Sequence, residues 1–335
     1  MKRTLAALAL GLAVSAPQAL ATEFPTKPIR VLVPYGPGGA TDISTRIVLE
    51  EVRRHMKQPL VVENKPGGSG VVALNDALRS GADGHTLIVG NITTNLLQPI
   101  IGDPPTPFDA FKDFVPVIRM VSIPSVLIVT KVDFPPNTLK EFVDYARKNP
   151  GKINHTVAGI LNYSHLDWLT LQKRAGIELM PIPLKGGAGG GQTDILNGLI
   201  HAGLQNAATV MPFVKTGRVK AIAVANEERL PGYPDVPTFA EQGFPGIGTS
   251  GWQALFAPAG TPKEVLEILN SAFNEALKSD RVRKQLLDLQ YTIVPTKSPA
   301  EAQAWLDAQR KEWTPKIADA LEIYRAQEKA AQSKK

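Results

Sequence analysis

The residues whose types and spacing could do chemistry lie in a glycine-rich segment, residues 34–42, which has the sequence PYGPGGATD. Glycines permit backbone conformations that bring amide groups close to a ligand. A helix that begins here adds unpaired N–H groups and a partial positive charge. Such a segment can hold an anion through backbone amides alone, or it can be a plain turn between a strand and a helix. The local pattern leaves both interpretations open.

Two other glycine-rich segments approach nucleotide-binding motifs but lack an essential residue. Residues 186–193 follow the spacing of a P-loop, with Gln192 in place of the lysine that contacts the outer phosphates. Residues 68–73 fit the dinucleotide fingerprint, but no acidic residue follows about 20 positions later. The sequence therefore predicts neither nucleotide binding nor any other cofactor.

No set of side chains predicts catalysis. Ser164 and His165 are adjacent, so on a helix they point in different directions. Asp42 is expected in the first turn of a helix, where a cap is a better explanation than a catalytic carboxylate. Lys185 either attracts a carboxylate or lies solvated at the surface. None of the histidines has a compact metal-binding spacing; they are His55, His85, His155, His165 and His201.

The first 21 residues have the pattern of a signal peptide. Lys2 and Arg3 precede an apolar run at 5–14, and Ala19-Leu20-Ala21 is a cleavage signal. No cysteine follows the run to carry a lipid, and no later segment is apolar enough to span a membrane. We therefore expect export to the periplasm, with cleavage near Ala21.

The composition describes a chain held together by its cores. The 335 residues are 43% hydrophobic and include no cysteine. The net charge of +6 falls to +4 without Lys2 and Arg3, and the basic residues form no patch with interleaved aromatics. Nucleic acid is therefore not an expected partner.

Strands and helices alternate twice along the chain, which predicts an α/β fold with two mainly parallel sheets flanked by helices. Ligands of such sheets bind beyond the carboxyl ends of the strands, where residues 35–42, 64–70 and 90–95 all fall. The predicted strands are 29–33, 60–62, 86–89, 153–157, 179–184, 219–225 and 252–257. The predicted helices are 71–79, 138–148, 164–174, 192–197, 262–278, 280–289 and 299–323, after a helical stripe of Ile43, Ile47, Val48, Val52 and Met56.

The chain is expected to cross between two domains near residues 121–126. The first domain comprises residues 22–122 and 248–335, and the second comprises residues 123–247. The long helix at 299–323 is expected to brace the first domain.

A series of motifs in a fixed order resembles one known family, the periplasmic solute-binding proteins of the tripartite tricarboxylate transporters, also called Bug proteins. The matching segments are 24–42, 61–70, 83–90, 165–166, 185–188, 219–224, 228–243 and 257–262. The resemblance implies a two-domain clamp of the type II-like periplasmic binding proteins. It also implies that the protein is not an enzyme but a monomeric receptor that delivers a small carboxylate to integral-membrane transporter subunits, or to a sensor.

The resemblance also carries over the ligand-binding positions. In the first domain they are Tyr35, Gly38, Gly39, Thr41, Asp42, Asn64 and Asn91. In the second domain they are Ala158, Gly159, His165, Lys185, Gly186, Gly187 and Asn206.

The sequence departs from the family pattern in two places in the second domain. Ile160, Leu161 and Tyr163 add apolar surface, and residues 189–191 are three glycines. These changes predict a roomier, less polar site for the distal end of the ligand, so aromatic acids and longer dicarboxylates join di- and tricarboxylates as expected ligands. The alternatives are a secreted carboxylate-acting hydrolase or isomerase that uses His165 and Asp42, and an adhesion module without a ligand cleft.

Overall fold

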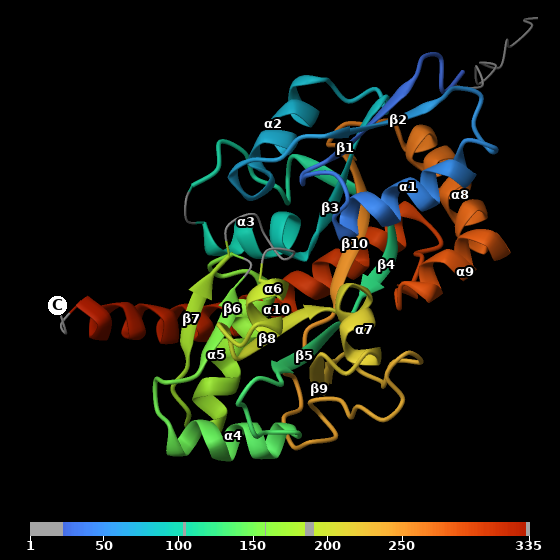
Figure 1. Cartoon of the computed structure of the whole chain (residues 1–335). Coiled ribbons are helices and arrows are strands. Elements are labelled where there is room, and N and C mark those ends of the chain that lie inside the picture. Colours follow the sequence, from blue (N-terminus) through green and yellow to red (C-terminus); the bar gives the residue numbers. More distant parts are fainter. Residues whose placement is uncertain (1–22, 103–104, 158, 185–190, 333–335) are drawn as a thin grey trace, which may run out of the picture.

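The computed structural model describes residues 23–102, 105–157, 159–184 and 191–332 (Figure 1). The predicted signal peptide lies outside these residues. The described chain forms two β-sheets, each covered by helices on both faces. No helix among the described residues is long and apolar enough to cross a membrane.

The first sheet has six strands within the described chain, in the order β11-β4-β10-β3-β1-β2. β1 runs parallel to its neighbours β2 and β3, whereas β10 runs antiparallel to both β3 and β4. The strands are β1 (Ile29–Val33), β2 (Leu60–Asn64), β3 (Thr86–Asn91), β4 (Phe114–Ile123), β10 (Gly251–Pro258) and β11 (Thr292–Ile293).

The second sheet has five strands within the described chain, in the order β7-β6-β8-β5-β9. β6 is parallel to β7 and β8, and β5 is antiparallel to β8 and β9. The α/β prediction is confirmed, and both sheets are mixed rather than mainly parallel, since β5 and β10 each run antiparallel to both of their neighbours. The strands are β5 (Ser125–Thr130), β6 (Asn154–Val157), β7 (Met180–Pro183), β8 (Ala202–Asn206) and β9 (Val219–Ala225).

Alternation along β1 builds two cores in the first half of the molecule. Val31 and Val33 face one core, which is covered by α1 (Ala40–Val52), α8 (Lys263–Lys278) and α9 (Asp280–Asp288). Leu32 faces the other core, because successive side chains of a strand point to opposite faces. That core is covered by η1 (Gly68–Gly70), α2 (Val71–Arg79), the π-helical turn η2 (Thr93–Leu97), α3 (Gln98–Ile101) and α10 (Pro299–Gln332).

The second sheet also has a core on each face, because successive side chains of β5 point to opposite faces. Leu127 and Val129 face a core covered by α4 (Leu139–Lys148) and α5 (Tyr163–Ala175). Val126 and Ile128 face the opposite core, beside α6 (Gln192–Leu196) and α7 (Ala207–Lys215). The sequence did not predict β8 and α7, which lie between two predicted elements.

The chain passes from one sheet to the other at Pro124, which separates the end of β4 from the start of β5. It returns through residues 226–250, between β9 and β10. The predicted crossing falls at this point, while the division into domains stays a prediction.

The last helix, α10, contacts both halves. It was expected to brace the first domain, but it also packs along α5, and it continues through Pro315 as far as Gln332 (Figure 1). The predicted apolar stripe of α1 is also wrong at two positions. Ile43 is 38% exposed, and Met56 lies beyond the end of the helix, although it still packs against the core that α1 covers.

Candidate functional site

The turn between β1 and α1 presents backbone amides without a capping side chain. Gly38 has a φ of +80°, a conformation that favours glycine. Gly39 is the N-cap, and no side chain accepts a hydrogen bond there. Within the described residues, the amides of Ala40, Thr41 and Asp42 have no acceptor. The start of α1 is therefore an open set of N–H donors with the partial positive charge of a helix N-terminus.

The carboxylate of Asp42 fixes the shape of this turn. Its Oδ2 accepts a hydrogen bond of 2.9 Å from the amide of Gly38. Its Oδ1 accepts hydrogen bonds of 2.9 Å from Arg46 Nε and from Asn64 Nδ2. Burial acts to raise the pKa of Asp42, but the bonds from Arg46, Gly38 and Asn64 together lower it below the ordinary value. The predicted helix cap is wrong in detail, because Asp42 holds the loop rather than the first-turn amides.

Neighbouring strand ends supply the rest of the first-sheet side. Asn64, at the end of β2, also donates to the carbonyl of Tyr35 at 3.0 Å. Asn91, at the end of β3, donates to the hydroxyl of Tyr35 at 2.7 Å. Burial raises the pKa of Tyr35 to about 12, so its hydroxyl stays protonated and available as a donor. The structure therefore brings together Tyr35, Asp42, Asn64 and Asn91, which the sequence placed at one edge of the sheet.

The second-sheet side is built around the start of α5. Asn162 caps this helix, because its Oδ1 accepts from the amide of His165 at 2.9 Å. The ring of His165 accepts at Nδ1 from the amide of Leu161 at 3.0 Å. Leu161 has a φ of +57°, so this bond holds the residue in a conformation unusual for a branched side chain. His165 thus fixes the segment 159–162.

These contacts argue against a Ser164–His165 catalytic pair. The Ser164 hydroxyl bonds to Asn162 Oδ1 at 3.0 Å. Burial lowers the pKa of His165 to about 4, so the ring is neutral near pH 7. Since Nδ1 accepts a hydrogen bond, the proton lies on Nε2, and neither ring nitrogen is free to act as a base.

The structure describes only some of the remaining predicted ligand-binding residues. Asn206 ends β8 beside Ser125, at the crossing between the sheets. Gly159 lies in the segment that His165 fixes. Ala158, Lys185, Gly186 and Gly187 lie outside the described residues. Among the described residues, no group of three or more His, Asp or Glu is arranged to hold a metal ion.

Tyr163 is the residue whose position the sequence did not reveal. Its hydroxyl hydrogen-bonds with the Ser125 side chain, and burial raises its pKa. It lies so close to Gly251 that a Cβ there would be 3.5 Å from the phenol oxygen. Its hydroxyl is near enough to those of Tyr35 and Tyr291 for a charge on Tyr163 to raise the pKa of both. Tyr163 therefore links the start of α5 to both crossings and to the β1–α1 turn.

Two buried amides near the strand ends were also missed. Asn95 packs on Gly90 of β3, and Gln253 lies on β10 opposite Asn91. Each is 1% exposed, and within the described residues the side-chain nitrogens have no hydrogen-bond partner. A glutamine inside the apolar strand 252–257 was the available signal, since a buried amide requires a reason.

Comparison with known proteins identifies the family. The model of the tripartite tricarboxylate transporter family receptor matches residues 44–320. Protein BugT of Bordetella pertussis is 32% identical over 285 residues, which cover 84% of this chain and 86% of BugT. The structure of Rpa4515 from Rhodopseudomonas palustris with adipate is 28% identical, with a TM-score of 0.80 over 89% of this chain and 98% of that one. MatC from the same organism, with bound malate, is 31% identical, with a TM-score of 0.78 over 88% of this chain and 100% of that one.

These similarities confirm the resemblance carried by the motifs, and they extend over both sheets. The chain belongs to the tripartite tricarboxylate transporter family of receptors.

Proposed function

We propose that the protein is an exported receptor that captures a small carboxylate between its two halves. The observation that carries the proposal is the β1–α1 turn. Its amides at Ala40, Thr41 and Asp42 have no acceptor among the described residues, and Asp42 holds the turn in shape through Gly38. A carboxylate matches this array, because an anion at a helix N-terminus accepts several N–H bonds at once. The relatives with adipate and malate support the same ligand class.

The ligand would be gripped from both sides. On the first side we assign contacts to Tyr35, Gly38, Gly39, Thr41, Asn64 and Asn91, with Asp42 contributing its amide. On the second side we assign them to Ala158, Gly159, His165, Lys185, Gly186, Gly187 and Asn206.

We further propose that the distal end of the site favours an apolar or aromatic ligand body. Ile160 is 46% exposed on the segment held by His165, and Leu161 and Tyr163 follow it. An exposed isoleucine gains from covering by an apolar ligand. Di- and tricarboxylates, longer dicarboxylates and aromatic carboxylates therefore form the panel to be compared.

Capture would proceed by closure of two domains about the crossings at Pro124 and residues 248–250. The domains are residues 22–122 with 248–335, and residues 123–247. Ligand contacts made only in the closed form shift the population toward closure. The closed monomer would then be recognised in the periplasm by integral-membrane transporter subunits or by a sensor.

The rival function is a hydrolase or isomerase that uses His165 and Asp42. Both groups are engaged, His165 with Leu161 and Asp42 with Gly38, Arg46 and Asn64. Incubation of each bound carboxylate with the protein, followed by mass spectrometry, decides between the two. Unchanged ligand supports the receptor, and a converted product supports the enzyme.

A pair of glycine variants tests the role of the turn. Gly38 and Gly81 have nearly equal φ values, +80° and +83°, and a Cβ at either meets nothing within 4 Å. Gly38→Ala and Gly81→Ala therefore carry a matched backbone penalty, but only Gly38 lies in the β1–α1 turn. Calorimetry against adipate, malate, citrate and terephthalate should show at least about a tenfold loss for Gly38→Ala alone, which corresponds to about 1.4 kcal/mol. Equal affinities of the two variants for the best ligand would refute the assignment.

A further inference from the structure

A cavity lies between α5, α10 and the chain that returns from β9 to β10, and no residue of the β1–α1 turn lines it. Its volume is about 240 Å³. Its lining comes from three separate parts of the chain, so tertiary packing creates it. The lining residues are Leu166, Asp167, Thr170, Lys173, Arg174, Gly246, Thr249, Trp313, Lys316, Asp319 and Ile323.

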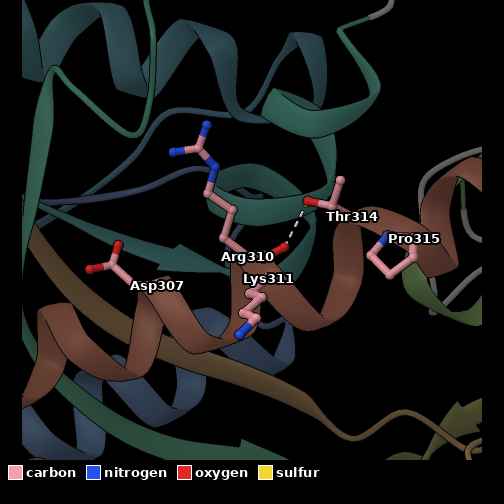
Figure 2. A pocket seen from close by; sticks show the side chains of 5 residues that line it. All are labelled: Asp307, Arg310, Lys311, Thr314 and Pro315. Carbon is pink, nitrogen blue, oxygen red and sulfur yellow. Dashed lines mark hydrogen bonds between the residues drawn. The ribbon is translucent and has the colours of Figure 1, made fainter.

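A second hollow lies on α10 itself and is a poor candidate by comparison. Figure 2 shows its lining residues, all from one helix, with the hydroxyl of Thr314 bonded to the carbonyl of Arg310 at 2.7 Å. That bond lies beside Pro315, which has no N–H to donate to the preceding turn. The five side chains of one helix cannot surround a ligand.

One part of the cavity between α5 and α10 is apolar. Leu166 and Trp313 are 3% and 6% exposed, and both belong to the core beneath α10, with Ile323 packed against it. Apolar walls of this kind favour an aromatic ring or a short alkyl chain.

The polar part of the cavity has an excess of cations. Lys173 is exposed and forms no ion pair or hydrogen bond within the described residues. Lys316 lies 5.0 Å from the centre of the Trp313 ring, so a cationic group borders the apolar part. Arg174 is committed to the carbonyl of Pro245. Lys316 is itself paired with Glu312, its Nζ lying 2.6 Å from Oε1, whereas a carbonyl partner leaves the charge of Arg174 uncompensated. Within the described residues, the lining cations that no acidic side chain pairs with are therefore Lys173 and Arg174.

The acidic residues of the lining do not cancel this preference. Asp167 is 5% exposed, and its two oxygens accept from the amide and hydroxyl of Thr249 at 2.6 and 3.0 Å. The Asp167 carboxylate is therefore already engaged by Thr249 of the chain that returns from β9 to β10. Asp319 lies on the exposed side of α10.

We propose that this cavity binds a small amphipathic carboxylate, a monocarboxylate with one ring or a chain of about six to eight carbons, as a second ligand of the protein. The ring or chain lies against Leu166, Trp313 and Ile323, and the carboxylate is held by Lys173. The volume supports this size, because a cavity of about 150 Å³ holds benzene and drug-sized ligands need at least about 300 Å³.

The test uses the full protein labelled with 5-fluorotryptophan and titrated with benzoate. The Trp313 signal is assigned with Trp313→Phe, and the expected result is a saturable shift of that signal. The shift should persist when adipate is present in excess, because adipate is directed to the β1–α1 turn. If adipate does not bind at all, the Trp313 shift still reports on the cavity, so failure of the proposed function and failure of this site are distinguishable.

A ligand of opposite charge and three variants test whether the cavity binds through its positive charge and its volume. Benzylamine has nearly the same shape as benzoate with the opposite charge, and it should cause no shift. Lys173→Glu should weaken benzoate binding about three- to tenfold, whereas Lys57→Glu, at an exposed lysine outside the cavity, should leave it unchanged. Thr170→Trp, which fills the cavity, should abolish it. An absent Trp313 shift, competition by adipate, an equal response to benzylamine, or unchanged affinity in both Lys173→Glu and Thr170→Trp would overturn the proposal.

Discussion

Replacement of Asp42 by asparagine should destabilise the protein well beyond the loss of a surface charge. Asparagine has nearly the same shape as aspartate, but only one of its two side-chain atoms is an acceptor. The carboxylate now receives three donors, from Gly38, Arg46 and Asn64. In the variant, an NH₂ group faces at least one of these donors.

The size of the effect follows from the burial of the carboxylate. The Asp42 side chain is 4% exposed, whereas its partner Arg46 is 51% exposed. The ion pair with Arg46 therefore contributes less than about 1 kcal/mol. A hydrogen bond to a charged group contributes about 1.5–3 kcal/mol, and at least one of the three donors loses such a bond. We expect the free energy of unfolding to fall by about 2–4 kcal/mol in Asp42→Asn.

Urea unfolding, followed by circular dichroism at pH 7, measures this change. Asp144→Asn is the matched control, because Asp144 also pairs with a cation on its own helix, Lys140, but is 42% exposed. It should change the stability much less. The pKa of Asp42 is lowered by folding, so its stabilising effect is complete above the ordinary value of 3.8 and is lost as the pH falls below it. The difference between wild type and Asp42→Asn should shrink below about pH 4. Equal stability of Asp42→Asn and wild type at pH 7 would refute the bracing role.

Three further predictions concern the two sheets and the returning chain. Gly90→Ala should reduce the free energy of unfolding by about 1–3 kcal/mol, because a Cβ would lie 2.3 Å from Asn95 Oδ1; Gly36→Ala, where a Cβ meets nothing within 4 Å, should cost less than about 0.5 kcal/mol by the same urea titration. Burial lowers the pKa of His155 to about 3, so the unfolded chain binds a proton that the folded chain excludes, and stability falls on acidification below pH 6.5. In His155→Phe the loss of stability between pH 7 and pH 5 should be smaller by about 2 kcal/mol; a loss as steep as in wild type would contradict this. Thr249→Val removes one donor from the buried Asp167 and should cost about 1–2 kcal/mol in urea unfolding, with an unchanged midpoint as the contrary result.

The sequence predicted correctly those elements whose conformation is determined by their own residues. The strand β1 and the glycine turn before α1 are such cases, as is α4, which begins after Thr138 because the Thr138 side chain accepts a hydrogen bond from the amide of Glu141. β8 was missed because its sequence, Ala202–Asn206, includes a glycine and a glutamine and shows little alternation. Its pairing with β5 and β6 makes it a strand, and neither pairing is local.

The arrangement of the site was predictable in part. Parallel strands bring their carboxyl ends to one edge, so the meeting of Tyr35, Asp42, Asn64 and Asn91 followed from strand order alone. The position of Tyr163 did not, because it depends on the antiparallel insertion of β10 and on the crossing at Pro124. The packing of α10 on α5 was also unpredictable, since an amphipathic helix does not specify its partner.

The place of β10 in the first sheet has a consequence for the order in which the chain can fold. β10 separates β3 from β4, so this sheet stays divided until residues 251–258 have been synthesised. The second sheet, by contrast, uses one continuous stretch between Ser125 and Ala225. Domains of a chain generally fold as units in the order of their synthesis, but here the later-starting sheet can be completed first. The sheet that contains the first strand of the chain can therefore be the last to be completed.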